Sequence, residues 1–90
     1  MIHDIYAYTI IKYPVSTEKS IRLMELENKL IFAVDIQATK RDIKKAIEEM
    51  FKVKVLQVNT FITSKGQKRA YVKFDPETPA IDIATQLGIM

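Results

Sequence analysis

One segment, residues 29–61, constrains the fold more than any other part of the chain. Its middle, residues 40–52, repeats apolar side chains at the three- and four-residue spacing of one helix face: Ile43, Ala46, Ile47 and Met50. Thr39 stands where a side chain can cap this helix. The apolar run 30–34 precedes the helix, and residues 53–63 follow it with apolar side chains on both sides of an extended chain. We therefore predict a strand, a helix and a second strand that is covered on both faces.

The residues before this segment predict one strand and one helix. Residues 4–13 are rich in β-branched and aromatic side chains, and Pro14 ends the run, so we expect a strand at or near a sheet edge. A helix should follow, with Ser16 or Thr17 as its cap. Asn28 is a suitable left-handed terminator for this helix.

The residues after the central segment predict a β-hairpin and a short helix. Residues 63–69 are polar, contain a glycine and form the expected tip. Residues 70–74 alternate as the second arm, with Tyr71 and Lys73 opposite to Ala70, Val72 and Phe74. Thr78-Pro79 is typical of a helix start. The helix should span residues 80–87 and pack through Ile81, Ile83, Ala84 and Leu87, with Gly88 as its terminator.

The predicted order is β-α-β-α-β-β followed by a short C-terminal helix. Strands joined by a tight hairpin must run in opposite directions, which favours a mostly antiparallel sheet. We expect an α+β fold, with helices packed on a four-stranded sheet, in a single domain over residues 1–90.

Composition excludes several classes of function. The chain has no cysteine, one histidine and two glycines, so thiolate metal sites, histidine relays and glycine-rich phosphate loops have no residues to build them. We therefore predict no catalytic residue, no metal site and no cofactor. No apolar run approaches the roughly 20 residues that span a bilayer, and the N-terminus lacks a signal segment, so we expect a soluble intracellular protein.

The net charge of +3 is unevenly distributed along the chain. Residues 1–39 carry 4 basic and 5 acidic side chains, residues 40–73 carry 10 and 3, and residues 74–90 carry 0 and 3. A net +7 in the middle of a small domain suits binding to a polyanion. The alternative is that these charges only solvate a surface helix and a hairpin tip.

The candidate binding residues form three groups. The first lies near the start of the central helix and comprises Lys40, Arg41, Lys44 and Lys45. The second surrounds the hairpin tip and comprises Lys65, Lys68 and Arg69, with Tyr71 close behind to stack on an unpaired base. The third flanks the Pro14 turn and comprises Lys12, Lys19 and Arg22. Alternatively, Tyr71 covers the sheet and the helix lysines only keep the protein soluble.

Several stretches together resemble one known family. They are IKYPVSTEKS at 11–20, ENKLIFAVD at 27–35, ATK at 38–40 and FKVKVLQVNT at 51–60. The chain is similar, over residues 9–90, to the universal large-subunit ribosomal protein twenty-three family. KGQK at 65–68, AYV at 70–72 and IATQLGI at 83–89 resemble its archaeal and eukaryotic branch.

The resemblance implies a cytoplasmic protein of the large ribosomal subunit that binds large-subunit rRNA beside the mouth of the polypeptide exit tunnel. It also implies contacts with neighbouring ribosomal proteins and a docking platform for the signal recognition particle, nascent-chain factors and the protein-conducting channel, without membrane insertion. The hairpin tip lacks the long basic extension of the bacterial branch. We expect the isolated protein to be a monomer.

The resemblance also assigns roles to residues. The family's proline-to-lysine motif, which packs against RNA, is matched by Lys12, Pro14, Thr17, Glu18 and Lys19. Glu18 is the candidate for factor docking, and its alternative role is to stabilise the first helical turn. Lys40 and Arg41 match a basic helix start, and Asn59 and Thr60 match a strand motif that contacts RNA. Fixed hydrogen bonds to the RNA would come from Ser16, Thr17 and Asn59.

Two other classes of function compete with this interpretation. A small protein-protein adaptor of ferredoxin-like shape could use an exposed sheet face or edge strand. A ligand-binding regulatory domain of the same shape would need a pocket with convergent polar groups, which the sequence does not indicate.

Overall fold

The computed structural model describes residues 10–88. Its elements are β1 (Ile11–Pro14), α2 (Glu18–Glu27), β2 (Lys29–Val34), α3 (Lys40–Phe51), β3 (Val55–Ile62), β4 (Lys68–Phe74) and α4 (Ala80–Leu87). The strands form one sheet in the order β1-β2-β4-β3, and every neighbouring pair is antiparallel. The predicted α+β class, the order of elements and the four-stranded antiparallel sheet are confirmed.

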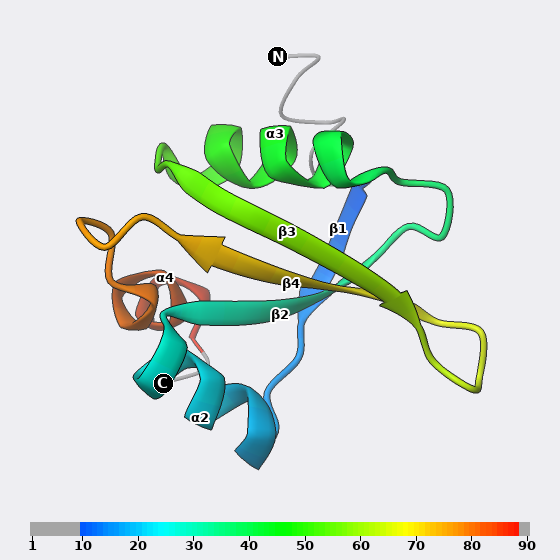
Figure 1. Ribbon diagram of the computed structural model, residues 1–90, viewed down its shortest axis with the longest axis horizontal. Helices are drawn as coiled ribbons and strands as arrows, with labels where there is room; N and C mark the ends of the chain where they lie inside the picture. The colour runs from blue at the N-terminus through cyan, green and yellow to red at the C-terminus, as the bar shows by residue number, and fades with distance from the viewer. Residues whose placement is uncertain (1–9, 89–90) are drawn as a thin grey trace.

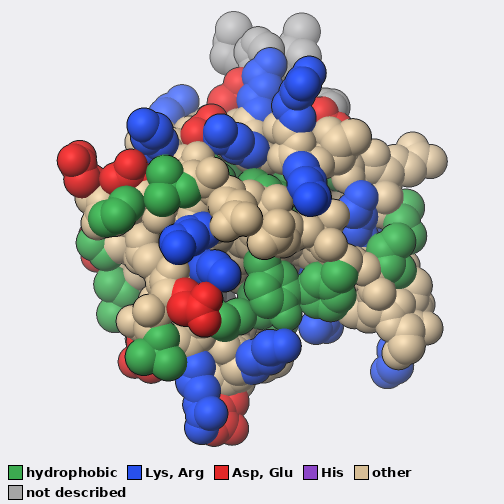
Figure 2. Space-filling model, in the orientation of Figure 1, with side chains coloured by type: hydrophobic (Ala, Val, Ile, Leu, Met, Phe, Trp, Pro, Cys, Tyr) green, Lys and Arg blue, Asp and Glu red, His purple; other side chains and the backbone are tan. Residues whose placement is uncertain are grey.

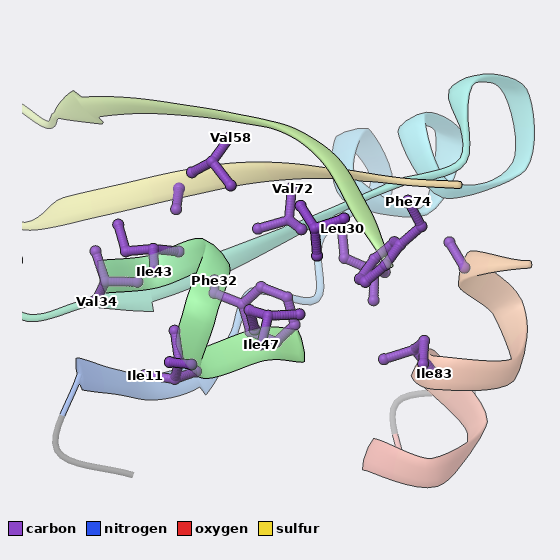
Figure 3. Packing of buried hydrophobic residues seen from close by; sticks show 14 of the residues in the cluster. Ile11, Leu30, Phe32, Val34, Ile43, Ile47, Val58, Val72, Phe74 and Ile83 are labelled. Atoms are coloured by element: carbon purple, nitrogen blue, oxygen red, sulfur yellow. The ribbon is translucent and has the colours of Figure 1, made fainter. Parts of the chain in front are cut away.

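The helices cover the sheet unevenly. Figure 1 shows α3 along one side of the sheet. Helices α2 and α4 lie next to each other, near the end of β2 where that strand begins. The main core lies between α3 and the sheet, and it extends to Met24 of α2 and to Ala80, Ile83 and Ala84 of α4. Leu30, Phe32 and Val34 of β2 point toward Ile43 and Ile47 of α3 (Figure 3). Burying each of these large side chains contributes about 2 kcal/mol.

The alternation predicted for the second hairpin arm is confirmed in β4. Ala70, Val72 and Phe74 are fully buried in the main core, whereas Tyr71 and Lys73 are only partly buried. Successive side chains of a strand point to opposite faces of the sheet. Ala70, Val72 and Phe74 therefore pack in the core, and Tyr71 and Lys73 lie on the opposite face.

Side-chain caps fix the starts of α2 and α3. The Thr17 hydroxyl accepts from the Ser20 N–H at 3.2 Å, and the Ser20 hydroxyl accepts from the Thr17 N–H at 2.7 Å. Thr39 and Asp42 make the same reciprocal pair at the start of α3, with both distances 3.1 Å. Each pair satisfies two backbone N–H donors. The predicted cap Thr39 is confirmed, and of the two candidates for the cap of α2, Ser16 and Thr17, the cap is Thr17.

Asn28 joins the end of α2 to residues 74–80, a stretch far from it in the sequence. It ends α2 in the left-handed conformation, as predicted, with φ of 57°. Its amide nitrogen donates to the carbonyl oxygens of Phe74, Asp75 and Thr78 at 3.1–3.3 Å. Its amide oxygen accepts from the Ala80 N–H at 2.6 Å. Asn28 therefore caps α4 from the end of another helix, and Pro79 is the residue before α4 instead of its first residue.

Several predicted boundaries are wrong. The first strand begins at Ile11 and includes Pro14, and residues 4–9 of the predicted strand lie outside the described part of the chain. Pro14 fits because β1 is an edge strand, where a missing N–H interrupts no ladder. Lys68 and Arg69 belong to β4, not to the tip, because they pair with β3 and β2. The sequence predicts that Ile81 packs against the core, but Ile81 is 45% exposed and Ala80 is buried there instead.

The prediction that the second strand of the central segment is covered on both faces is wrong. β3 is the other edge of the sheet, and only Val55 and Val58 are buried in it. A register shift between Val55 and Gln57 turns both valines toward α3, so the strand does not keep the regular alternation on which the prediction relied. Phe61 and Ile62 remain exposed, at 39% and 58%.

We expect Asn28→Ala to lower the free energy of unfolding by about 3 kcal/mol, because it removes four hydrogen bonds and leaves a non-glycine residue in the left-handed region. Asn28→Gly loses the same hydrogen bonds but has no left-handed strain. Its free energy of unfolding should therefore be about 1 kcal/mol higher than that of Asn28→Ala. Urea denaturation of both variants checks this. Equal stability of Asn28→Ala and the wild type would contradict the role of Asn28.

Candidate nucleic-acid interface

The side of the sheet that faces away from α3 carries the candidate site. We call it the open face and define it by the side chains of Tyr13, Asn59, Phe61, Arg69, Tyr71 and Lys73. Strand register sets Tyr13, Ala33, Arg69 and Phe61 in one row, and Ile31, Tyr71 and Asn59 in the next. Val15 and Leu23 pack against Ile31 and Ala33, and this small cluster covers the open face only near β1 and β2. The part over β3 and β4 stays accessible.

Aromatic and basic side chains meet on this accessible part. The rings of Phe61 and Tyr71 contact edge to face, with centroids 5.1 Å apart and planes at 71°. The Lys19 ammonium lies 5.8 Å from the centroid of the Tyr71 ring, so α2 brings a cation onto the sheet. Figure 2 shows hydrophobic side chains in the middle of the view, with several Lys and Arg side chains and one acidic group close to them. The open face can therefore both stack on flat groups and attract anions.

Hydrogen bonds orient the Arg69 guanidinium at the edge of this patch. Its Nε donates to the Gln67 side-chain oxygen at 3.0 Å, and the Gln67 side-chain nitrogen donates to the Tyr13 hydroxyl. This chain of contacts links β1, the hairpin loop and β4. Arg69 has further N–H donors in a planar fork that suits a phosphate oxygen pair.

The predicted residues around the Pro14 turn adjoin the open face. Lys12, Ser16, Thr17 and Lys19 are exposed, and Pro14 is half-buried. Thr17, Glu18, Lys19 and Arg22 line one surface hollow. The Thr17 hydroxyl is the cap of α2, and Glu18 accepts from Arg22 at 3.3 Å across one helical turn. Because both charged side chains of that pair are mostly exposed, at 71% for Arg22 and 82% for Glu18, the pair contributes at most about 0.5 kcal/mol and leaves both accessible.

The hairpin tip forms a second hollow beside the open face. Its lining comprises Thr63, Ser64, Lys65, Gln67 and Arg69. Lys65 is exposed at the turn that Gly66 makes with φ of 85°. The tip therefore adds one cation to the same end of the sheet as Arg69.

The basic residues of α3 form a separate surface, which we call the helix face: Lys40, Arg41, Lys44 and Lys45. All four are exposed, whereas Ile43, Ala46 and Ile47 of the same helix are buried against the sheet. The core and the sheet stand between the helix face and the open face. The structure thus divides the predicted binding residues between two sides of the protein.

Thr60 and Lys68 point toward the α3 side of the sheet. Thr60 pairs in register with Ala70, which is buried in the main core, so it faces away from its neighbour Asn59. The Lys68 ammonium donates to the carbonyl oxygen of Ala38 at 2.6 Å and of Ile36 at 3.4 Å. Lys68 thereby fixes the connection between β2 and α3.

Phe61 and Lys73 are not among the binding residues predicted from the sequence, but they lie on the open face. Lys73 lies beside Gln57 in register and near the aromatic pair. Phe61 follows the predicted contact Asn59 by two positions on β3, and Lys73 follows the predicted contact Tyr71 by two positions on β4. Pairing the two strands of the hairpin in register could have found them, because residues two apart on a strand share a face.

The described part of the chain offers no site for a metal ion. Among residues 10–88, no group of three His, Cys, Asp or Glu side chains could hold one. None of the helices in this range has the length and apolar character needed to cross a bilayer.

Comparison with known proteins identifies the family. A family model described as "Ribosomal protein L23" matches residues 9–81. The chain belongs to the ribosomal protein L23 family. The large ribosomal subunit protein uL23 of Methanococcus aeolicus is 48% identical over 83 residues, which cover 92% of this chain and 96% of that protein. The protein of the same name from Methanococcus vannielii is 49% identical with the same coverage. The predicted family resemblance is confirmed.

We expect Lys68→Ala to destabilise the fold by about 1 kcal/mol, because it removes the donor that holds the carbonyl groups before α3. Lys65→Ala, at the exposed tip of the same hairpin, should leave the stability within about 0.5 kcal/mol of the wild type. Thermal unfolding of the two variants checks this. Unchanged stability of Lys68→Ala would show that the Lys68 contact with Ala38 does not stabilise the protein.

Proposed function

We propose that this protein, a constituent of the large subunit of the cytoplasmic ribosome, binds large-subunit rRNA through its open face and acts as a structural component, not as an enzyme. Membership in the ribosomal protein L23 family and the two large-subunit relatives support the assignment to this subunit and its location. The observation that carries the RNA-binding proposal is the aromatic pair of the open face with Lys19, Arg69 and Lys73 around it.

The proposed contacts on and beside the open face follow from its chemistry. Cations there neutralise phosphates, and the Asn59 amide offers a directional hydrogen bond to a base or a 2′-hydroxyl. The cationic members are Lys12, Lys19, Arg22, Lys65, Arg69 and Lys73, and the uncharged members are Pro14, Ser16, Asn59 and Tyr71. Thr17 acts by holding the start of α2, because its hydroxyl is the cap. Specificity then comes from the shape of the folded RNA.

The helix face makes a second, independent RNA contact in this proposal. Lys40, Arg41 and Lys44 are exposed on the far side of the core, so one RNA strand on the open face cannot reach them. The protein would lie between two RNA segments and hold them at a distance set by its own thickness. Thr60 and Lys68, which also face that side, support the fold beneath this contact.

We propose, from the family resemblance, that this binding takes place beside the mouth of the polypeptide exit tunnel. There the protein would help to form the docking platform for the signal recognition particle, nascent-chain factors and the protein-conducting channel. Glu18 is the proposed docking residue, since its carboxylate is largely exposed at the first turn of α2 and only loosely paired with Arg22. Leu26 is 82% exposed at the other end of the helix and suits a neighbouring ribosomal protein. Before assembly we expect a monomer.

The two-sided arrangement predicts two separable footprints on large-subunit rRNA. We expect a triple alanine variant at Lys19, Arg69 and Lys73 to lose one set of protected nucleotides, and one at Lys40, Arg41 and Lys44 to lose a different set. Each phosphate contact removed should reduce the slope of log K against log salt by about 0.7–0.9. Lys54→Ala, an exposed lysine on neither surface, is the control. Binding by the wild type that does not weaken as salt rises would overturn the proposal and favour the adaptor.

We expect Glu18→Gln to weaken binding of the signal recognition particle to ribosomes about tenfold, equal to about 1.4 kcal/mol, while rRNA affinity stays unchanged. The matched control is Glu25→Gln, because Glu25 is also exposed on α2 but lies outside the hollow lined by Glu18. Ribosome binding assays with reconstituted large subunits measure both. Equal effects of the two substitutions would reduce Glu18 to a helix-stabilising residue.

A further inference from the structure

The two aromatic rings of the open face differ in how much they are already in contact with the protein. Tyr71 packs against the Val15, Ile31 and Ala33 cluster, and the Lys19 ammonium lies over its ring. Phe61 lies on the edge strand β3, belongs to neither hydrophobic cluster, and is 39% exposed. Of the two rings, Phe61 is the more exposed and so offers more surface to a ligand.

The surroundings hold the Phe61 ring in place. Phe61 is directly opposite Arg69 in the β3–β4 register, and its ring meets Tyr71 at 71°. An edge-to-face contact of this kind favours this orientation of the ring over others. A ring held in this way loses little conformational entropy when a flat group stacks on it.

The polar groups around Phe61 match one kind of flat ligand. Arg69 and Lys73 supply positive charge on the same face, and Asn59 lies two residues before Phe61 on β3, about 7 Å along the strand. A nucleobase carries a π-face, a hydrogen-bonding edge and a nearby phosphate, and these three features meet the ring, the amide and the cations. Because a base inside a duplex has no free face, the base must be unpaired.

We propose that Phe61 stacks on an unpaired nucleobase of large-subunit rRNA, with Tyr71 as the positioning residue that holds the Phe61 ring. This deepens the proposed function and rests on it, because the nucleobase belongs to the rRNA on the open face. The sequence predicts that Tyr71 stacks on an unpaired base, whereas in this proposal the stacking residue is Phe61. Arg69 contacts the phosphate of the same nucleotide, and Asn59 contacts its base edge or ribose.

The chain contains no tryptophan, which allows a direct test of stacking. Phe61→Trp places the only tryptophan of the chain at the proposed contact, and stacking on a base should quench the tryptophan emission when large-subunit rRNA of Methanococcus vannielii is added. Ile62→Trp is the matched control, because Ile62 is the adjacent exposed residue and points to the other face of the same strand. We expect strong quenching at position 61 and little at position 62.

Affinity measurements separate ring stacking from simple apolar contact. Phe61→Leu keeps an apolar side chain without the aromatic ring and should weaken rRNA binding at least about fivefold, while Phe61→Trp keeps wild-type affinity. Ile62→Ala should change the affinity less than twofold. Adding Tyr71→Leu to Phe61→Trp should reduce the quenching on saturating rRNA, which a merely structural role of Tyr71 would leave unchanged. Thermal unfolding confirms that each variant is folded.

The possible results distinguish this proposal from the proposed function. If the wild type binds the rRNA and the Phe61→Leu variant binds equally well, with no quenching in Phe61→Trp, the stacking proposal is overturned and rRNA binding stands. Equal quenching at positions 61 and 62 would also overturn it. If the folded wild type does not bind the rRNA at moderate salt, the proposed function itself fails.

Discussion

The packing of α3 against the two central strands is the contact on which the rest of the structure depends. Ile43 and Ile47 fill the space above Leu30, Phe32 and Val34, and β4 adds three fully buried side chains to the same layer. This single layer holds most of the apolar surface that a chain of 90 residues can bury. The protein therefore has one well-packed side of its sheet, and the other side is free to carry polar, basic and aromatic residues.

Polar residues divide into those that hold the fold and those that remain available for binding. Asn28, Thr17 and Lys68 all bond backbone groups through their side chains: Thr17 at the start of α2, Asn28 at the start of α4 from its place at the end of α2, and Lys68 in the loop before α3. Buried or half-buried backbone groups need such partners, since an unsatisfied one costs about 1–3 kcal/mol. Arg69 differs, because a glutamine and a tyrosine orient it on the surface.

The arrangement of the helix and sheet layers determines where the basic residues lie on the surface. The basic middle of the sequence becomes two surfaces, because α3 exposes its lysines on one side and the hairpin brings its cations to the other. Lys19 comes from the first described helix and still lies over Tyr71 of the last strand. A flat basic patch would suit any polyanion, whereas cations fixed at opposite sides of a rigid core favour an RNA that folds around the protein.

The sequence by itself determined the fold class, the order of elements, the helix cap at Thr39, the left-handed end at Asn28 and the family, and it narrowed the other cap to Ser16 or Thr17. These features depend on local periodicity, on capping chemistry and on motifs that are contiguous in the chain. Only the tertiary structure decided which residues share a surface. The bulge after Val55 changed which side chains of β3 face the core, Lys68 turned inward to the loop before α3, and Phe61 came to lie beside Tyr71. Strand register and helix placement fix these contacts, and both depend on how distant segments pack together.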